Sequence, residues 1–149
     1  MRLTIAAVGR AREGPMRALY DDYVGRLPWQ VTLREVPETD GPQRSEREGE
    51  KLLAAIPDGA HVITLDETGK TMNSRKIAAW IGRQRDEGCR DLAIVIGGAD
   101  GLTDLIRKRA DLVLSFGAMT WPHMMVRTML AEQLYRAHTI LTGHPYHRG

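Results

Sequence analysis

The sequence is poor in cysteine and in long hydrophobic runs. Cys89 is the one cysteine among 149 residues, which excludes a disulfide within the chain and any metal site built from several cysteines. No motif surrounds Cys89, so we interpret its thiol as structural or incidental rather than reactive. No stretch reaches the about 18 apolar residues of a membrane helix, and the N-terminus does not resemble a signal peptide. We therefore expect a cytoplasmic protein with no membrane partner.

A strong charge of either sign is also missing. Lysine and arginine total 21 against 19 aspartate and glutamate, which gives a net charge of +2, and 42% of the residues are hydrophobic. This composition argues against disorder, and the length fits one compact domain spanning residues 1–149. The small positive charge permits a nucleic-acid partner, but an ordinary solvated surface accounts for it equally well.

Five short runs rich in valine, isoleucine and leucine have the length of strands. They are residues 3–8, 31–36, 61–65, 92–96 and 112–116. Segments with helical spacing lie between and after them, at residues 16–27, 46–56, 73–85, 103–109 and 123–139. This alternation predicts an α/β fold with a mostly parallel sheet flanked by helices. Runs 61–65 and 92–96 are continuously apolar, which is typical of strands buried on both faces.

Residues 38–50 form the least apolar stretch, with a Thr-Asp-Gly-Pro turn followed by alternating arginine and glutamate. We interpret this stretch as a mobile surface connection that leads into a charged helix. The sequence leaves open whether it contacts a substrate or is simply loose.

A glycine-rich turn, Gly97-Gly98-Ala99-Asp100-Gly101, directly follows one of the buried strands. Ligands of parallel α/β sheets bind beyond the carboxyl ends of the strands, where glycine lets the backbone approach a ligand. The turn matches neither the dinucleotide fingerprint nor the P-loop. A ligand site and a plain tight turn are therefore equally good interpretations.

The loop after the last predicted strand is free of charge, which is unusual for a loop exposed to solvent. Its residues are Phe116, Gly117, Ala118, Met119, Thr120 and Trp121. Such a loop could bind an adenine through main-chain groups, with Met119 and Trp121 as walls. It could equally lie packed under the C-terminal helix.

The tail concentrates titratable and aromatic side chains in Tyr146, His147 and Arg148, which can stack on bases and pair with phosphate. A frayed, solvated end is the alternative. His123, His144 and His147 do not predict a metal site, because no pair has the i, i+4 helical spacing and no carboxylate is closely interleaved with them.

Taken together, these segments resemble the ribosomal RNA large subunit methyltransferase H family, part of the SPOUT class of α/β-knot methyltransferases. The resemblance runs the whole length of the chain and is most specific in the last third. The motifs that carry it are Gly97-Gly98-Ala99-Asp100-Gly101-Leu102, Met119-Thr120-Trp121-Pro122-His123, Glu132-Gln133-Leu134-Tyr135-Arg136-Ala137 and His144-Pro145-Tyr146-His147-Arg148.

The resemblance implies a deep C-terminal trefoil knot, an exception to the usual rule against knots. It also implies a homodimer, S-adenosylmethionine as cofactor, and methylation of N3 of a pseudouridine in 23S rRNA, preferably on assembled ribosomes. The implied cofactor contacts are Leu65, Gly97 and residues 116–121. Phe116, Gly117 and Trp121 depart from the residues common in the family, which should matter little if the contacts are made by the main chain.

Methyl transfer to a ring nitrogen requires that nitrogen to lose its proton, which a histidine can accept. His123 and His147 are the candidates, with Tyr146 stacking on the substrate and Arg148 meeting a phosphate. Two other hypotheses are a non-catalytic RNA-binding module, which would not bind the cofactor, and a nucleotide-binding enzyme that uses the glycine turn for phosphate. The second lacks the Lys-Ser/Thr that should follow those glycines.

Overall fold

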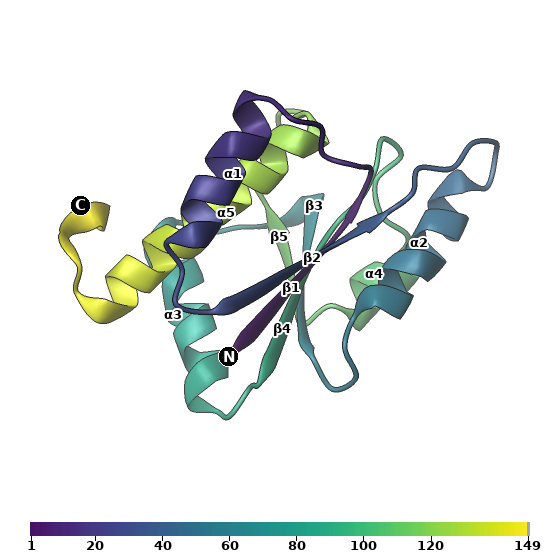
Figure 1. Ribbon diagram of the computed structural model, residues 1–149. Helices are drawn as coiled ribbons and strands as arrows, with labels where there is room; N and C mark the ends of the chain where they lie inside the picture. The colour runs from purple at the N-terminus through teal and green to yellow at the C-terminus, as the bar shows by residue number, and fades with distance from the viewer. Residues whose placement is uncertain (149) are drawn as a thin grey trace.

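The computed structural model describes residues 1–148 as a central sheet with helices on both faces (Figure 1). The strands are β1 (Arg2–Val8), β2 (Gln30–Val36), β3 (His61–Thr71), β4 (Asp91–Ile96) and β5 (Leu112–Ser115). The helices are α1 (Pro15–Gly25), α2 (Arg44–Ala55), α3 (Ser74–Asp86), α4 (Asp104–Arg109), α5 (His123–Thr142) and the short 3-10 helix η1 (Pro145–His147).

The five strands have the order β2-β1-β4-β3-β5, and every neighbouring pair is parallel. Helices α1, α3 and α5 cover one face over a large hydrophobic cluster that includes Ile5, Ile94 and Leu134. Helices α2 and α4 cover the other face over a smaller cluster that includes Leu52 and Val95. The predicted parallel α/β sheet is thus confirmed, including the full burial of Leu92, Ala93, Ile94 and Val95 at 0% exposure.

Local signals fix several helix ends. Asn73 caps α3 by accepting a hydrogen bond from the Lys76 N–H at 2.9 Å. Helix α5 ends where Gly143 adopts φ +75°, a left-handed conformation that glycine takes without strain. No helix within residues 1–148 has the length and apolar character needed to cross a bilayer.

Two boundaries differ from expectation. Strand β3 does not end at residue 65 but shifts register there and pairs again with β5 through Lys70 and Thr71. A Cβ on Gly69 would lie 2.7 Å from the Val113 carbonyl oxygen, so only glycine fits where β3 comes back to pair with β5. Helix α2 begins at Arg44, inside the stretch expected to be a connection, and Thr39 before it is anchored because its N–H donates to Glu48 at 2.9 Å.

Candidate functional site

Because all five strands are parallel, the segments that follow them emerge at one edge of the sheet. Leu65 pairs with Ile96 of β4 on one side and with Leu114 of β5 on the other. Gly97 and Phe116 therefore follow closely on either side of Leu65. The structure brings the three segments of the predicted cofactor set together at the carboxyl edge, where ligands of parallel sheets bind.

The glycine turn after β4 is tight in its own right. Gly98 and Gly101 form a bridge, with the Gly101 N–H donating to the Gly98 carbonyl at 3.0 Å, and Gly101 has φ +76°. A Cβ on Gly97 would lie 2.9 Å from the Gly101 carbonyl oxygen. Gly97 is thus required by the turn itself, whatever the turn binds.

A second anchor holds the same turn from α2. Arg44 donates to both carboxylate oxygens of Asp100, at 2.5 and 2.6 Å. This guanidinium holds the pKa of the Asp100 carboxyl below its ordinary value. Residues near 44 thereby brace the glycine turn, a role that the sequence alone did not indicate.

Asp66, directly after Leu65, ties the β3 irregularity to α4. It accepts hydrogen bonds from the Thr68 N–H at 2.9 Å and from Arg107 Nε at 2.8 Å. Burial raises the pKa of Asp66, but the bonds from Thr68 and Arg107 outweigh it and leave the pKa below its ordinary value. The sequence alone did not indicate that Arg107 takes part in this arrangement.

Most main-chain groups of loop 116–121 are available to bind a ligand. Ser115 Oγ accepts from the Gly117 N–H at 3.1 Å, and Gly117 has φ +113° with open space around it. Within residues 1–148, no hydrogen bond involves the main-chain groups of residues 118–121. Trp121 Nε1 is buried without a partner, and Met119 is 69% exposed. These free donors and acceptors, in an uncharged setting, fit a cofactor with an adenine edge and a cationic sulfonium.

A groove of about 590 Å³ lies between α1, α3, α5 and the end of β5. Its apolar wall includes Leu19, Met72, Ile77, Phe116 and Met129, and its polar wall includes Tyr23 and Glu132. We call this the α5 groove. Phe116 and Gly117 are the members of the predicted cofactor set that line it.

The tail packs beside the polar wall of the α5 groove. The Tyr146 hydroxyl lies 3.1 Å from the Tyr23 hydroxyl and donates to Glu132 Oε1 at 3.0 Å. Burial, with these two hydrogen bonds, raises the pKa of Tyr146 above its ordinary value. The ring contacts Tyr135 edge-on, with 4.7 Å between centroids, so Tyr146 is already packed within its own chain. Arg148 is exposed, and His147 Nδ1 is buried without a partner.

His123 lies elsewhere. It begins α5, and its Nε2 is 3.9 Å from Glu38 Oε1. The His147 carbonyl accepts from Arg136 at 3.5 Å, roughly 20 Å along the α5 axis from His123 at 1.5 Å per residue. The two candidate proton acceptors are therefore not brought together within one chain. No three His, Cys, Asp or Glu side chains of residues 1–148 are grouped as metal ligands would be.

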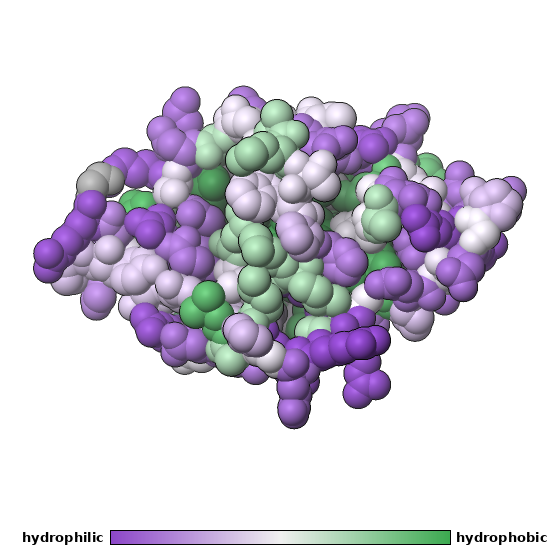
Figure 2. Space-filling view, turned by 90° about the horizontal axis from the view of Figure 1, so that it is seen from above, coloured by the Kyte–Doolittle hydropathy of each residue, from purple (hydrophilic) through white to green (hydrophobic). Residues whose placement is uncertain are grey.

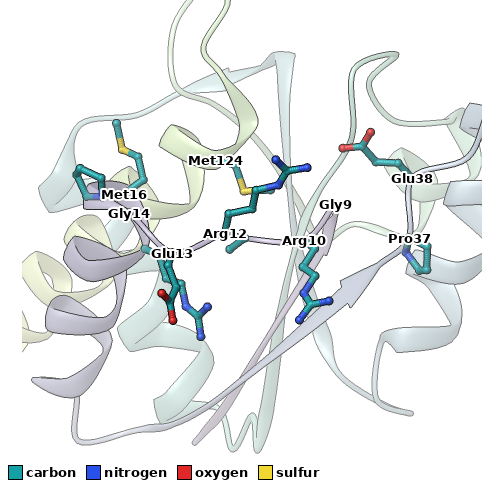
Figure 3. A pocket seen from close by; sticks show the side chains of 12 residues that line it. Gly9, Arg10, Arg12, Glu13, Gly14, Met16, Pro37, Glu38 and Met124 are labelled. Carbon is teal, nitrogen blue, oxygen red and sulfur yellow. The ribbon is translucent and has the colours of Figure 1, made fainter.

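A further pocket, of about 1040 Å³, opens where β1 and β2 end. Its walls are residues 9–17, Pro37, Glu38 and Met124 (Figure 3). A Cβ on Gly9 would lie 3.0 Å from Glu38 Oε1, 3.3 Å from Met124 Cε and 3.4 Å from His123 Nε2. The missing side chain of Gly9 thus keeps the floor of this pocket open beneath His123.

A family model and two curated relatives agree on the family to which this chain is similar. Residues 1–147 match the family described as "Predicted SPOUT methyltransferase". The chain is 55% identical to "Ribosomal RNA large subunit methyltransferase H" of Rhodospirillum centenum, over 99% of each chain. It is 56% identical to the protein of that name in Paramagnetospirillum magneticum, again over 99% of each.

Solved structures show the same fold at low sequence identity. A probable methyltransferase from Bordetella pertussis Tohama I superposes with a TM-score of 0.60 at 15% identity, covering 91% of this chain and 95% of that one. A probable methylase family protein from Haemophilus influenzae Rd KW20 superposes with a TM-score of 0.59 at 14% identity, covering 99% and 70%. The SpoU methyltransferase AviRb from Streptomyces viridochromogenes, solved with the cofactor AdoMet, has a TM-score of 0.50 at 15% identity, covering 92% and 58%.

Proposed function

This chain belongs to the SPOUT methyltransferase family, and from that premise we propose that it uses S-adenosylmethionine to methylate N3 of a pseudouridine in 23S rRNA. The substrate is the assembled ribosome, which places the reaction in the cytoplasm. The observation that carries the proposal is the convergence of Leu65, Gly97 and loop 116–121 at one edge of the sheet.

The cofactor supplies a methyl group already activated as a sulfonium, so no metal is needed. The protein has to bind and orient it in a dry, uncharged setting. The unpaired main-chain groups of residues 118–121 and the buried Trp121 Nε1 would bind its polar edges. Gly97, fixed by its own turn, and Leu65 would form the opposite wall. We also propose that this region forms the deep trefoil knot implied by the family.

The target nitrogen carries a proton, which must leave as the new N–C bond forms. His123 and the tail residue His147 are the candidate acceptors, Tyr146 and Arg148 the candidate positioning groups. His123 lies next to loop 116–121 in sequence, whereas the tail lies beside the α5 groove of its own chain. One chain alone therefore does not gather all four residues around a single point.

A homodimer would resolve this separation. Met16 and Leu19 on α1 are 39% and 46% exposed, and Met119 in the cofactor loop is 69% exposed. A band of hydrophobic side chains crosses the middle of the face seen in Figure 2, with polar side chains on both flanks. We propose that a second copy covers the α5 groove, so that the tail of each chain lies beside loop 116–121 of the other.

The test of the activity uses ribosomes from a strain that lacks this modification, with isolated subunits in parallel and labelled S-adenosylmethionine. We expect label on N3 of one pseudouridine, identified by mass spectrometry of the nucleosides. Cofactor binding without label would contradict the assigned substrate. Failure of the folded protein to bind the cofactor would favour a non-catalytic RNA-binding module.

The shared site has its own test by complementation. A Gly117→Arg chain should lose the cofactor loop, and a His147→Ala chain should lack the tail function. If each site combines the loop of one chain with the tail of the other, mixed dimers contain one intact site and recover up to about a quarter of the activity. If loop and tail of one site come from the same chain, a mixed dimer of these two variants has no intact site and recovers none.

A further inference from the structure

The loop between β1 and α1, residues 9–14, separates two cavities. On one side is the pocket of about 1040 Å³ at the ends of β1 and β2 (Figure 3). On the other is a smaller cavity of about 220 Å³, whose lining includes Tyr20, Glu35 and Arg127. Arg10, Ala11 and Arg17 line both. We call residues 9–14 the arginine loop.

The arginine loop carries two cationic side chains that form no ion pair within residues 1–148. Within residues 1–148, neither Arg10 nor Arg12 has a carboxylate within ion-pair distance, whereas Arg2, Arg26, Arg44, Arg107, Arg127 and Arg136 all do. Figure 3 shows Arg10 and Arg12 extending to opposite sides of the loop, with Glu13 directed away from Arg12. Each guanidinium is therefore free to bind an anion on its own side.

The smaller cavity has unmet hydrogen-bonding capacity at its base. Arg127 is 2% exposed and its Nε has no partner, and Tyr20 is 8% exposed with an unpartnered hydroxyl. Burial raises the pKa of Tyr20 to about 12, so the hydroxyl keeps its proton and can donate. Buried donors are normally hydrogen-bonded, so these two would be satisfied by a ligand in the cavity that supplies acceptor atoms.

Carboxylates near the two cavities are mostly engaged. Glu35 accepts from Arg127 Nη1 at 2.7 Å and from the Ala11 N–H at 2.6 Å, so Arg127 is its ion-pair partner, and Arg10 attracts it only from beyond ion-pair distance. Asp21 lies 3.9 Å from Arg17. Glu38 stands on the far wall of the larger pocket, beside His123. The loop thus presents Arg10 and Arg12 against a single carboxylate of its own, Glu13, which also lines the larger pocket.

The loop is also fixed in place before any ligand binds. Arg127 Nη2 donates to the Gly9 carbonyl at 2.6 Å and to the Val8 carbonyl at 3.1 Å. Together with the Ala11 bond to Glu35, these contacts hold both ends of the segment that carries Arg10. A loop that is already rigid loses little conformational entropy when it binds a ligand, so less of the electrostatic attraction is offset by ordering the loop.

The arginine loop adjoins the proposed methyl-transfer site. Strand β1 pairs with β4, and a Cβ on Gly98 would lie 3.0 Å from Val8 Cγ1. We propose that the arginine loop binds phosphodiester groups of the RNA strand that carries the target base, one beside Arg12 in the larger pocket and a neighbouring one between Arg10 and Arg17 in the smaller cavity. This inference rests on the proposed function and assigns the element that holds the RNA backbone next to the glycine turn.

The test compares the salt dependence of ribosome binding among variants. Arg10→Ala, Arg12→Ala and the double variant are matched by Arg83→Ala, an exposed arginine in the last turn of α3. Binding of fluorescently labelled protein to unmodified ribosomes is measured from 50 to 200 mM KCl at constant Mg²⁺. Each lost phosphate contact should reduce the slope of log K against log[salt] by about 0.7 to 0.9. The double variant should therefore lose about 1.5 in slope, and Arg83→Ala should lose none.

Two further readouts separate this role from a structural one. Calorimetric affinity for S-adenosylmethionine should be unchanged in all four variants, and KM for ribosomes should rise at least tenfold in the double variant with little change in kcat. The proposal would be overturned if the double variant kept the wild-type slope. It would also be overturned if Arg83→Ala lowered the slope as much as the double variant does. If the wild-type protein binds ribosomes but transfers no methyl group, the proposed function fails while the slopes still decide the role of the loop.

Discussion

Arg127 Nη1 lies 2.7 Å from Glu35 Oε2, and this partly buried pair joins the start of α5 to β2. The Arg127 side chain is 3% exposed, and its other nitrogen binds the carbonyls of Val8 and Gly9 at the end of β1. One guanidinium therefore fixes the strand ends, the arginine loop and the first turns of α5 relative to one another.

Replacing Arg127 with methionine should destabilise the fold strongly. The change leaves the buried Val8 and Gly9 carbonyls without their donor, which costs about 1 to 3 kcal/mol for each. Glu35 adds little to this loss, because it is 31% exposed and keeps its bond from the Ala11 N–H. Urea denaturation followed by circular dichroism measures the loss. Arg2→Ala removes a more exposed pair with Asp91 and should cost no more than about 1 kcal/mol. Similar small losses in both variants would contradict the structural role of Arg127.

Acid should weaken the fold in part through Asp66. Its pKa is lower in the folded state than in the unfolded state, so its stabilising contribution is full above pH about 4 and is lost as the pH falls through the folded pKa. Asp66→Asn should therefore be less stable than wild type at pH 7 and should show a shallower loss of stability as the pH falls below about 4.

Denaturation midpoints at several pH values test this expectation. Asp58→Asn is the matched control, because Asp58 is exposed in the turn before β3. That control should follow the wild-type profile. If stability falls equally steeply with decreasing pH in wild type and in Asp66→Asn, the pH dependence belongs to other carboxyls.

Gly97→Ala tests whether the glycine turn shapes the cofactor site. The added Cβ would come within 2.9 Å of both the Gly101 carbonyl oxygen and the Leu102 side chain, so the turn must shift. We expect affinity for S-adenosylmethionine to fall at least tenfold, which is about 1.4 kcal/mol. Gly25→Ala in α1 has open space around it and should keep that affinity while adding up to about 1 kcal/mol of stability. Unchanged cofactor affinity in Gly97→Ala would remove the turn from the site.

The fold could be predicted from the sequence because its elements are strongly patterned. All five apolar runs became strands, and the resemblance carried by motifs in the last third is confirmed by the family match. The return of β3 after residue 65 escaped prediction, because residues 66–71 are polar and the pairing with β5 depends on a contact made only in three dimensions.

The site was predicted less completely than the fold. The family resemblance pointed to Leu65, Gly97 and loop 116–121, and only the glycine turn and the uncharged loop also stand out locally. Arg127 and Glu35 did not stand out, since an ion pair between residues distant in sequence has no local pattern. The arginine loop was missed for a similar reason: two arginines near a strand end gain meaning only when their lack of carboxylate partners is known.

Tyr23 and Tyr146 should prove energetically coupled. Their hydroxyls lie 3.1 Å apart, and Tyr146 also donates to Glu132. Each single change to phenylalanine should cost about 0.5 to 1.5 kcal/mol. The double variant should cost less than the sum, because the shared bond is lost only once. Additive losses in urea denaturation would show that the tail does not dock on α1 in solution.

Trp121→Phe offers the most direct view of what loop 116–121 binds. Trp121 Nε1 is buried without a partner in residues 1–148, so removing the N–H should leave the ligand-free protein as stable as before or slightly more stable. If that N–H donates to the cofactor, affinity for S-adenosylmethionine should fall about five- to tenfold, the equivalent of one hydrogen bond. Calorimetry with the cofactor and thermal denaturation without it measure the two quantities separately. Loss of stability without the cofactor would identify Trp121 as a packing residue, and unchanged affinity would move the cofactor contacts to the main chain of residues 118–120.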